Sequence, residues 1–447
     1  MSVPRDIFAD TSLDDWLKTV ALPVARILDK ALNGHDLSPQ EALRLFDTSG
    51  PELWAVVLAA DQLRQRRVGD VVTYVVNRNI NFTNVCIKRC RFCAFSRDYR
   101  EEEGYLLPLE EIVRRAKEAW ELGATEVCIQ AGLAPQMEGD LYIRLCRAIK
   151  SEIPEIHIHG FSPEEVLYGA LRSRWSIRDY LKALKEAGVG SLPGTSAEIL
   201  VQDVRDAISP GRITVEQWIE VITTAHELGI PTSSTMMYGH IETHEHQVRH
   251  LAVIRDIQKA TGGFTEFVPL SFVHSRAPMF RHRLVTGVRP GPTGIEVLKV
   301  HAISRIMLNN WIPHLQVSWV KEGHRFGQVL LMAGANDLGG TLMNESISTS
   351  AGADHGQLLR PAEFRRLIRD VGRIPAERTT TYHLRWVFEN PQADPIEPLD
   401  MVSGDPDERF GSYFRLIGMN RYRFRHPHRP KQKGEGEISG PASPRRS

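Results

Sequence analysis

The feature that most constrains this chain is a repeated alternation of short apolar strands with helical segments. Counted from INFTNV, eight strand candidates follow one another: INFTNV, EVCIQAG, IHIHG, GSLPG, TSSTMMYG, FTEFVPLSF, HLQVSW and ANDLGG. Such alternation predicts a parallel sheet, and eight units predict a complete or nearly complete α/β barrel of the (β/α)8 TIM type. In that fold the chemistry lies at the C-terminal ends of the strands.

The segments on either side of the barrel are predicted to be extensions. LDDWLKTVALPVARILDKAL has apolar spacing near 3.6, and Ser38 to Glu41 reads as a capping box with proline at the first helical position. After the barrel come one helix in PAEFRRLIRDVG and a short strand in RTTTYHLRW. The expected organisation is an N-terminal helical extension at 1–68, the barrel at 69–355, a C-terminal helix and strand extension at 356–424, and a disordered tail at 425–447.

Composition narrows the class of protein. The 447 residues include 55 basic and 55 acidic side chains, so no net charge draws the chain to nucleic acid or to anionic lipid, and a solvated tail is favoured over one that binds nucleic acid. The N-terminus lacks a signal-peptide pattern, and no window approaches 18 apolar residues. Five cysteines without framework spacing argue against disulfides. We expect a cytoplasmic protein that binds neither nucleic acid nor a membrane.

Three cysteines indicate the chemistry. Cys86, Cys90 and Cys93 form a C-x3-C-x2-C motif in NFTNVCIKRCRFCAFSR, directly after the first strand counted above. Such a motif can hold three corners of a 4Fe-4S cluster and leave the fourth iron open. The arrangement is typical of radical-SAM enzymes, in which that iron binds S-adenosylmethionine and one electron releases a 5'-deoxyadenosyl radical.

A structural zinc site is the alternative interpretation of these cysteines. Zinc prefers four thiolate or imidazole ligands in a closed tetrahedron, and its close pairs are usually C-x2-C or C-x4-C. The other two cysteines, Cys128 in EVCIQAG and Cys146 in LYIRLCRAIK, are interpreted as ordinary buried thiols. The spacing favours the cluster, and a non-enzymatic zinc-binding protein stays as an alternative.

Several longer motifs carry a family resemblance over roughly residues 40–385. NINFTNVCIKRCRFCAFSR, IHIHGFSPEEV, GSLPGTSAEIL, SSTMMYGHIET, GGFTEFVPLSFVH, RPGPT and GANDLGGTLMNESIS together resemble the radical-SAM FO synthase family, in its 5-amino-6-(D-ribitylamino)uracil–L-tyrosine 4-hydroxyphenyl transferase branch. The resemblance implies L-tyrosine and 5-amino-6-(D-ribitylamino)uracil as substrates, a 4Fe-4S cluster and S-adenosyl-L-methionine as cofactors, and an external electron donor. Futalosine-pathway radical-SAM enzymes of menaquinone biosynthesis share the fold and the cysteine motif, and they remain an alternative.

The resemblance also assigns cofactor residues. The three cysteines match the cluster ligands, and Phe92 matches the residue whose backbone meets the adenine. Gln130 and Gly132 occupy the place of the glycine motif that contacts the methionine end, where a small residue lets the backbone approach the ligand. Ser196 and Glu198 are similar to polar contacts to the ribose or the amino acid part. A glutamate favoured by the helix dipole in a first turn is an equal interpretation of Glu198.

Residues after the fifth strand are predicted to be catalytic. Tyr238, His240 and Glu242 follow TSSTMM at the catalytic rim, and they match the family pattern YGH. The histidines that follow are interpreted as the solvated start of a helix rather than a zinc site: His244, His246 and His250.

Further residues are predicted to bind substrate. His157 and His159 share one face of their strand and are expected to point into the barrel, as substrate or proton-transfer candidates, with satisfied core histidines as the alternative. Glu266, Asn336 and Asp337 are placed at the sixth and eighth strands, although Asn or Asp beside glycine is also ordinary turn chemistry.

The mechanism implied by the resemblance is radical cleavage of tyrosine. The radical removes a hydrogen at the amino nitrogen, the Cα–Cβ bond breaks, the 4-hydroxybenzyl unit moves to C5 of the uracil, and a glycine-derived imine leaves. Closing the deazaflavin ring needs a second radical-SAM site, and the two remaining cysteines cannot form another C-x3-C-x2-C motif. We therefore expect a separate cyclising radical-SAM subunit as a partner.

Overall fold

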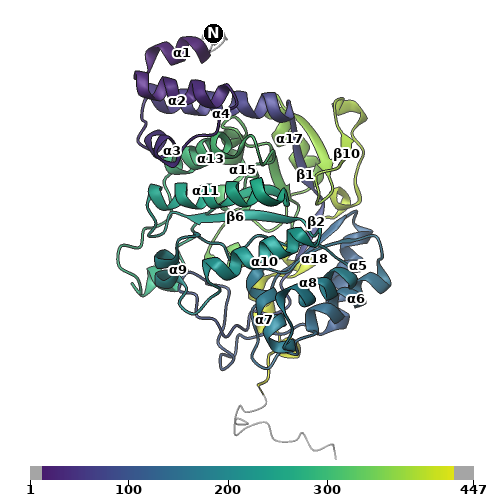
Figure 1. Ribbon diagram of the computed structural model, residues 1–447. Coiled ribbons are helices and arrows are strands. Elements are labelled where there is room, and N and C mark those ends of the chain that lie inside the picture. Colours follow the sequence, from purple (N-terminus) through teal and green to yellow (C-terminus); the bar gives the residue numbers. More distant parts are fainter. Residues whose placement is uncertain (1–12, 427–447) are drawn as a thin grey trace, which may run out of the picture.

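The computed structural model describes residues 13–426, so almost all of the predicted tail at 425–447 lies outside the described residues. The expected α/β barrel is confirmed, with parallel strands inside and helices outside (Figure 1). The strands are β1 (Val71–Val75), β2 (Asn77–Ile80), β3 (Glu126–Ile129), β4 (His157–Gly160), β5 (Val189–Ser191), β6 (Thr232–Tyr238), β7 (Phe264–Ser271) and β8 (Asp337–Gly340).

The barrel closes through three sets of paired strands and a few single bridges. Strands β2 to β5 are neighbours in one sheet, β6 pairs with β7, and β1 pairs with β8. Leu192 bridges to β6, while Leu315 and Gln316 bridge to β7 and β8 respectively. The seventh strand predicted from HLQVSW is thus reduced to Leu315 and Gln316.

The first barrel strand begins earlier than predicted. It consists of β1 and β2, which follow each other directly, and of the predicted strand INFTNV only Ile80 belongs to it. Its polar side chains Asn77 and Asn79 line the barrel interior, next to Val75. The cysteine loop still follows this strand at its C-terminal end.

The helices cover the outside of the barrel. Capping boxes at Ser162, Thr214, Thr243 and Thr293 fix the starts of four of them, because each hydroxyl accepts the backbone N–H three residues on. The helices are α5 (Leu109–Glu121), α6 (Leu141–Glu152), α7 (Pro163–Ser173), α8 (Ile177–Glu186), α9 (Gln202–Ile208), α10 (Val215–Glu227), α11 (His244–Thr261), α12 (Pro278–Arg281), α13 (Gly294–Leu308), α14 (Trp319–Glu322), α15 (His324–Leu331) and α16 (Ile347–Ala351).

The N-terminal segment is helical, as its apolar spacing predicts. Helices α1 (Leu13–Thr19), α2 (Leu22–Leu32), α3 (Pro39–Phe46) and α4 (Pro51–Val68) stack at one end of the molecule, where α3 packs on α11 and α4 packs on α13 (Figure 1). The predicted capping box is present, since Ser38 Oγ accepts from Glu41 N at 3.2 Å and Glu41 Oε2 accepts from Ser38 N at 2.7 Å. Among the described residues, no helix is long and apolar enough to cross a membrane.

The C-terminal segment adds a hairpin to the barrel wall instead of the single strand predicted. After α17 (Pro361–Asp370), β9 (Ile374–Arg378) pairs in parallel with β1, and β10 (Leu384–Val387) pairs antiparallel with β9. We call residues 378–383, at the tip of this hairpin, the floor hairpin. The chain then runs through η1 (Pro391–Ala393), η2 (Pro398–Met401), α18 (Pro406–Phe410), α19 (Tyr413–Gly418) and η3 (Asn420–Tyr422).

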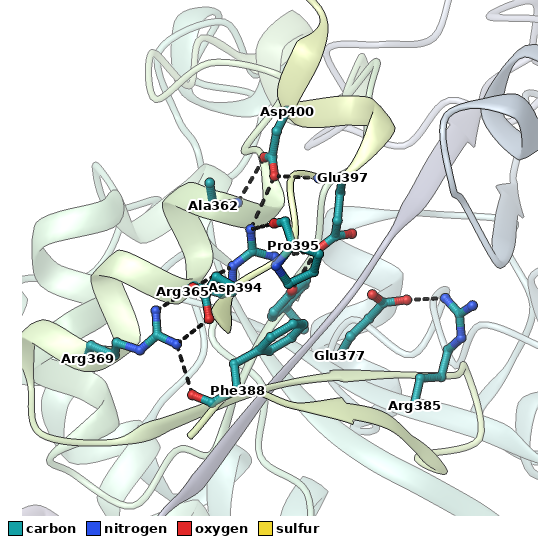
Figure 2. Close-up of polar contacts among 11 residues, drawn as sticks. Ala362, Arg365, Arg369, Glu377, Arg385, Phe388, Asp394, Pro395, Glu397 and Asp400 are labelled. Atoms are coloured by element: carbon teal, nitrogen blue, oxygen red, sulfur yellow. Dashed lines mark hydrogen bonds and ion pairs between the residues drawn. The ribbon is translucent and has the colours of Figure 1, made fainter. Parts of the chain in front are cut away.

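A buried arginine ties this segment together. Arg365 of α17 is 3% exposed in its side chain and faces the carboxylates of Asp394, Glu397 and Asp400 (Figure 2). Its guanidinium also lies 4.9 Å from the centroid of the Phe388 ring. These contacts join α17 to the chain that follows β10, and they thereby brace the β9–β10 hairpin from outside.

Candidate active site

A cavity of about 420 Å³ runs through the barrel from the cysteine loop to the floor hairpin. All of the residues predicted for the cluster and the cofactor line it, together with two of the predicted substrate residues. These are Cys86, Cys90, Cys93, Phe92, Gln130, Gly132, Ser196, Glu198, His159 and Glu266. The cavity therefore brings the cysteine motif and a set of polar side chains into one enclosed space.

The cysteine loop is held by backbone hydrogen bonds to its neighbours. Cys86 N donates to Arg97 O at 3.0 Å, Ile87 N donates to Leu133 O at 2.9 Å, and Cys93 N donates to Cys90 O at 3.1 Å. Burial raises the pKa of the Cys90 thiol to about 12, while the Arg212 guanidinium opposes the shift. The three thiols are half-buried and open into the cavity.

Gly132 contacts this loop more closely than any side chain would allow. A Cβ at this position would lie 2.4 Å from the Val85 carbonyl oxygen, which directly precedes Cys86. Gly132 N also donates to Thr83 O at 2.9 Å. The close backbone approach expected at this glycine is therefore made to the cysteine loop, and we assign it to positioning that loop.

Arg212 is a site residue that the sequence analysis missed. It donates to Ser196 Oγ at 2.6 Å, to Glu198 Oε1 at 2.7 Å and to Glu164 Oε2 at 3.3 Å, and its guanidinium lies 5.7 Å from the centroid of the Phe92 ring. Burial lowers the pKa of Arg212, but Cys90 and the carboxylates of Glu198 and Glu164 raise it overall. A permanent cation thus lies beside the cysteine loop.

The loop that holds Ser196 and Glu198 rules out one of the two interpretations of Glu198. Both residues have a positive φ, 63° for Ser196 and 44° for Glu198, and they lie in the loop between β5 and α9. The interpretation of Glu198 as a glutamate in the first turn of a helix is wrong, because α9 begins only at Gln202. The unusual backbone turns both side chains toward Arg212.

The opposite end of the cavity is a polar floor. Glu126, His159, Glu266, Arg378 and Thr380 line it, and the last two come from the floor hairpin. The Thr380 hydroxyl is buried beside the Glu126 carboxylate, whose pKa it helps to lower. Burial raises the pKa of Glu266 to about 7, with the Arg378 guanidinium opposing the shift. The floor thus presents both acidic and hydroxyl groups to a ligand.

The floor hairpin is anchored from within the barrel. Arg378 donates to Asp337 through Nε at 2.6 Å and through Nη2 at 3.1 Å. Tyr382, which has a φ of 64°, donates to Glu266 Oε2 at 2.5 Å and stacks on His314 with 3.7 Å between ring centroids. The hairpin is therefore fixed by residues of β7, β8 and the seventh strand position.

The two histidines of β4 lie on the same side of the strand, as expected. His159 lines the cavity, whereas His157 lies behind it and does not. The Ser191 hydroxyl of β5 bridges them, at 2.7 Å from His157 Nε2 and 2.7 Å from His159 Nδ1. Burial lowers the pKa of His157 to about 4 and also lowers that of His159.

The residues predicted to be catalytic do not line the cavity. Tyr238 is fully buried, and its hydroxyl accepts a hydrogen bond from Ser271 Oγ. His240 donates from Nε2 to Met237 O and accepts at Nδ1 from Ile241 N, so both ring nitrogens bond within its own loop. Glu242 accepts from Gly239 N at 2.6 Å and from His240 N at 2.9 Å. We correct the prediction accordingly, because these contacts assign Tyr238, His240 and Glu242 to fixing the loop between β6 and α11.

Asn336 and Asp337 are likewise enclosed by protein. Asn336 Oδ1 accepts from Arg305 Nη2 at 2.7 Å and from Leu315 N at 2.9 Å, so the residue ties the seventh and eighth strand positions together. Asp337 accepts from Arg378 and from Thr73 Oγ1, and neither residue lines the cavity. The prediction that they contact substrate is therefore replaced by a supporting role.

Two further predictions need correction. Cys146 is buried in α6 as expected, but Cys128 is half-buried and lines the cavity. His250 is fully buried, and its Nδ1 accepts from Leu200 N at 3.0 Å, so it does not belong to a solvated helix start. His244 stacks on Phe46 with 4.6 Å between ring centroids.

The zinc interpretation finds no support in the described residues. Among residues 13–426, no group of three or more His, Cys, Asp or Glu side chains is arranged to hold a metal ion. A zinc site needs its ligands on one ion, whereas the three cysteines of a cluster bind three separate irons.

Two sequence families match the chain. The Radical SAM superfamily matches residues 80–254, and the family described as the CofH/MqnC C-terminal region matches residues 261–391. The first includes the cysteine loop and the strands that follow it, and the second includes the floor hairpin.

Curated relatives share about half of their residues with this chain. A 5-amino-6-(D-ribitylamino)uracil–L-tyrosine 4-hydroxyphenyl transferase of Methanothermobacter thermautotrophicus is 52% identical over 357 residues, which is 80% of this chain and 96% of the relative. A protein of the same name from Methanocaldococcus jannaschii is 49% identical, over 78% of this chain and 97% of the relative. An FO synthase of Mycobacterium leprae is 50% identical over 77% of this chain, but the match spans only 40% of that longer protein.

Solved structures confirm the fold. The [FeFe]-hydrogenase maturase HydG has a TM-score of 0.63 at 17% identity, over 83% of this chain and 79% of HydG. Methylornithine synthase has a TM-score of 0.59 at 19% identity, over 78% of this chain and 97% of that protein. At such identities the likeness concerns the fold alone.

Proposed function

Because this chain belongs to the radical SAM family of 5-amino-6-(D-ribitylamino)uracil–L-tyrosine 4-hydroxyphenyl transferases, we propose that it transfers a 4-hydroxybenzyl group from L-tyrosine to the ribitylaminouracil. The observation that carries this proposal is the 52% identity to a relative of that name over 96% of its length. The cavity supports it, since one enclosed space joins the cysteine loop to a polar floor.

We assign the cluster to Cys86, Cys90 and Cys93. All three thiols open into the cavity, and no fourth cysteine is in the motif, as a cluster with one open iron requires. When bound, the cluster and S-adenosylmethionine supply a 5'-deoxyadenosyl radical. The chain's own contribution is to hold the loop in place, through Gly132 and the backbone contacts around it.

The residues between the cysteine loop and the middle of the cavity suit S-adenosylmethionine. Phe92 and Gln130 line this part, together with the loop that carries Ser196 and Glu198. Arg212 adds a cation beside two carboxylates, which matches a ligand that carries both an amino group and a carboxylate. We propose that Phe92 meets the adenine of the cofactor and that Gln130, Ser196, Glu198 and Arg212 bind its methionine and ribose parts.

The floor suits the two polar substrates. Glu266, His159 and Thr380 offer an acid, an imidazole and a hydroxyl to the phenol, the amine and the ribityl hydroxyls of the substrates. A closed barrel floor also keeps water from a radical formed in the cavity. Because the relatives matched over 96% and 97% of their length are named transferases, whereas the longer relative is named FO synthase, we further propose that a separate cyclising radical-SAM protein takes the adduct and that an external donor supplies the electron.

The test uses the full-length chain, purified and reconstituted without oxygen. Reductant, S-adenosylmethionine, tyrosine and 5-amino-6-ribitylaminouracil together are expected to give 5'-deoxyadenosine and a 4-hydroxybenzyl adduct, and omission of either substrate is expected to abolish the adduct. Turnover of a futalosine-type nucleoside with none of tyrosine would contradict the proposal. Stoichiometric zinc in place of iron and sulfide would contradict the cofactor assignment.

A further inference from the structure

We propose that His159, Ser191 and His157 form a proton-transfer path from the substrate cavity along the inner face of β4 toward solvent at the start of that strand. The inference rests on the proposed function, because it gives these residues the task of removing a proton from bound tyrosine. His159 would be the catalytic base that touches the substrate, and Ser191 and His157 would act through it.

The geometry of the three residues is continuous. His159 lines the cavity, and no hydrogen bond within the described residues engages its Nε2. Its Nδ1 lies 2.7 Å from Ser191 Oγ, which in turn lies 2.7 Å from His157 Nε2. Ser191 is 2% exposed and lies outside the cavity lining. His157 is partly exposed without lining the cavity, so the path ends at a residue that is not fully buried.

One hydroxyl between two imidazoles fixes the direction of the hydrogen bonds. Ser191 has a single proton to donate, so one ring donates to it and the other accepts from it. If His159 carries its proton on Nδ1, its Nε2 is free to accept a proton in the cavity. Ser191 then donates to His157 Nε2, and His157 carries its own proton on Nδ1.

Burial, aided by two nearby cations, keeps both rings of the path neutral. Burial lowers the pKa of each histidine, Glu126 of β3 opposes the shift in both, Lys150 of α6 adds to it at His157, and Arg378 of the floor hairpin adds to it at His159. Neutral rings are the form that can accept a proton at one nitrogen and release another at the opposite nitrogen.

The proposed reaction needs such a path. Tyrosine binds with an ammonium group, which must lose a proton before one of its N–H bonds can give up a hydrogen atom. In the proposed step the ammonium N–H bond breaks heterolytically and its proton goes to His159 Nε2. The Nδ1 proton of His159 passes to Ser191, the Ser191 proton passes to His157 Nε2, and the Nδ1 proton of His157 leaves to solvent. One proton enters the path and one leaves it, and no electron is transferred.

The path can be cut at two places without changing His159. Ser191→Ala removes the bridging hydroxyl, and Ser191→Thr keeps it. Gly190→Ala would place a Cβ 2.4 Å from Cε1 of the His157 ring, so this variant displaces His157 and leaves Ser191 intact. Ser304→Ala is the control, because Ser304 is a fully buried serine of α13 remote from the path.

The first readout is kcat for adduct formation by the full-length reconstituted enzyme at pH 7 and at pH 9.5. We expect Ser191→Ala and Gly190→Ala to lower kcat on the order of a hundredfold at pH 7, since a general base contributes at least that much. The loss of kcat in these two variants should be smaller at pH 9.5, because α-amino groups are mostly neutral at that pH before the substrate binds. Ser191→Thr and Ser304→Ala should stay within about threefold of wild type. A deficit equal at both pH values, or full activity of Ser191→Ala at pH 7, would overturn the path.

The second readout does not depend on turnover. Ring-nitrogen NMR of histidines in the protein without added substrate should show His157 and His159 neutral at pH 7, with their signals assigned from His157→Gln and His159→Gln. Ser191→Ala should shift both sets of signals and Ser304→Ala neither. Signals of His159 unchanged by Ser191→Ala would refute the bridge. A wild-type enzyme that makes no adduct while these shifts occur would refute the proposed function and support the bridge.

Discussion

Replacing Arg365 by methionine should destabilise the protein far more than the same change at the next residue of the helix. Arg365 is 3% exposed, whereas Arg366 is 65% exposed and, within the part of the chain that the structure describes, pairs only with Asp370, at 3.4 Å. Figure 2 shows Arg365 among three carboxylates, and its Nη2 also donates to the Pro395 carbonyl at 3.0 Å. Methionine keeps much of the volume and removes the charge.

The expected size of the effect follows from burial. Removing one partner of a buried ion pair costs about 3–5 kcal/mol, because the remaining charge is left without compensation. Here Glu397 and Asp400 lose the only guanidinium that contacts them among the described residues, while Asp394 keeps Arg369. An exposed pair contributes under about 1 kcal/mol, so Arg366→Met should be close to neutral.

The loss of folding stability caused by Arg365→Met should be smaller at acid pH. Burial raises the pKa of Glu397 and Arg365 opposes the shift, so loss of Arg365 should raise that pKa further. A carboxyl whose pKa is higher in the folded than in the unfolded state binds its proton more readily when folded, and folding therefore gains stability as pH falls through that pKa. The deficit should be smaller at pH 5 than at pH 8.

Urea unfolding followed by circular dichroism measures these differences, and urea adds no ions that would screen the charges. The wild type, Arg365→Met and Arg366→Met are compared at both pH values. Equal stability of the two variants, or a deficit of Arg365→Met that grows toward pH 5, would refute the role of Arg365.

Three other predictions concern the cysteine loop and the pathway. Cys86→Ser, Cys90→Ser and Cys93→Ser should each give folded protein with little iron, whereas Cys128→Ser and Cys146→Ser should keep it, and loss of iron from folded Cys128→Ser would contradict the assignment. Gly132→Ala should lower iron content because its Cβ meets the Val85 carbonyl at 2.4 Å, while Gly327→Ala, whose nearest contact is 3.6 Å, should not. The protein alone should accumulate a non-fluorescent adduct, and deazaflavin fluorescence from a preparation free of the cyclising partner would refute the division of labour.

Features that depend on a short stretch of sequence could be predicted from the sequence. The capping box at Ser38 and the barrel units follow from spacing within short windows, and the cysteine loop follows from a motif of eight residues, Cys86 to Cys93. The position of a residue after a strand was a weaker basis for predicting that it lines the site. Side chains alternate along β6, so Met237 lines the cavity while the adjacent Tyr238 points away from it. The prediction for Tyr238 used its place along the chain and not its direction.

Contacts between distant segments could not be predicted in this way. Arg378 reaches Asp337 from a hairpin that follows the barrel, and its sequence RTTTYHLRW shows only strand propensity. Arg212 lies in a loop after α9, and its contacts with Ser196 and Glu198 arise from two positive-φ residues in a preceding loop. Ser191, between His157 and His159, is likewise visible only once β4 and β5 are paired.

The central claim, that this chain breaks the Cα–Cβ bond of tyrosine and transfers the benzylic part, is tested most directly by tracing carbon. Tyrosine labelled with 13C at Cβ or at Cα is given to the reconstituted full-length enzyme with S-adenosylmethionine, reductant and 5-amino-6-ribitylaminouracil. The account predicts that the Cβ label appears in the uracil adduct and that the Cα label appears in glyoxylate, the hydrolysis product of the imine. Both labels in one product, or neither label in the adduct while 5'-deoxyadenosine is formed, would contradict it.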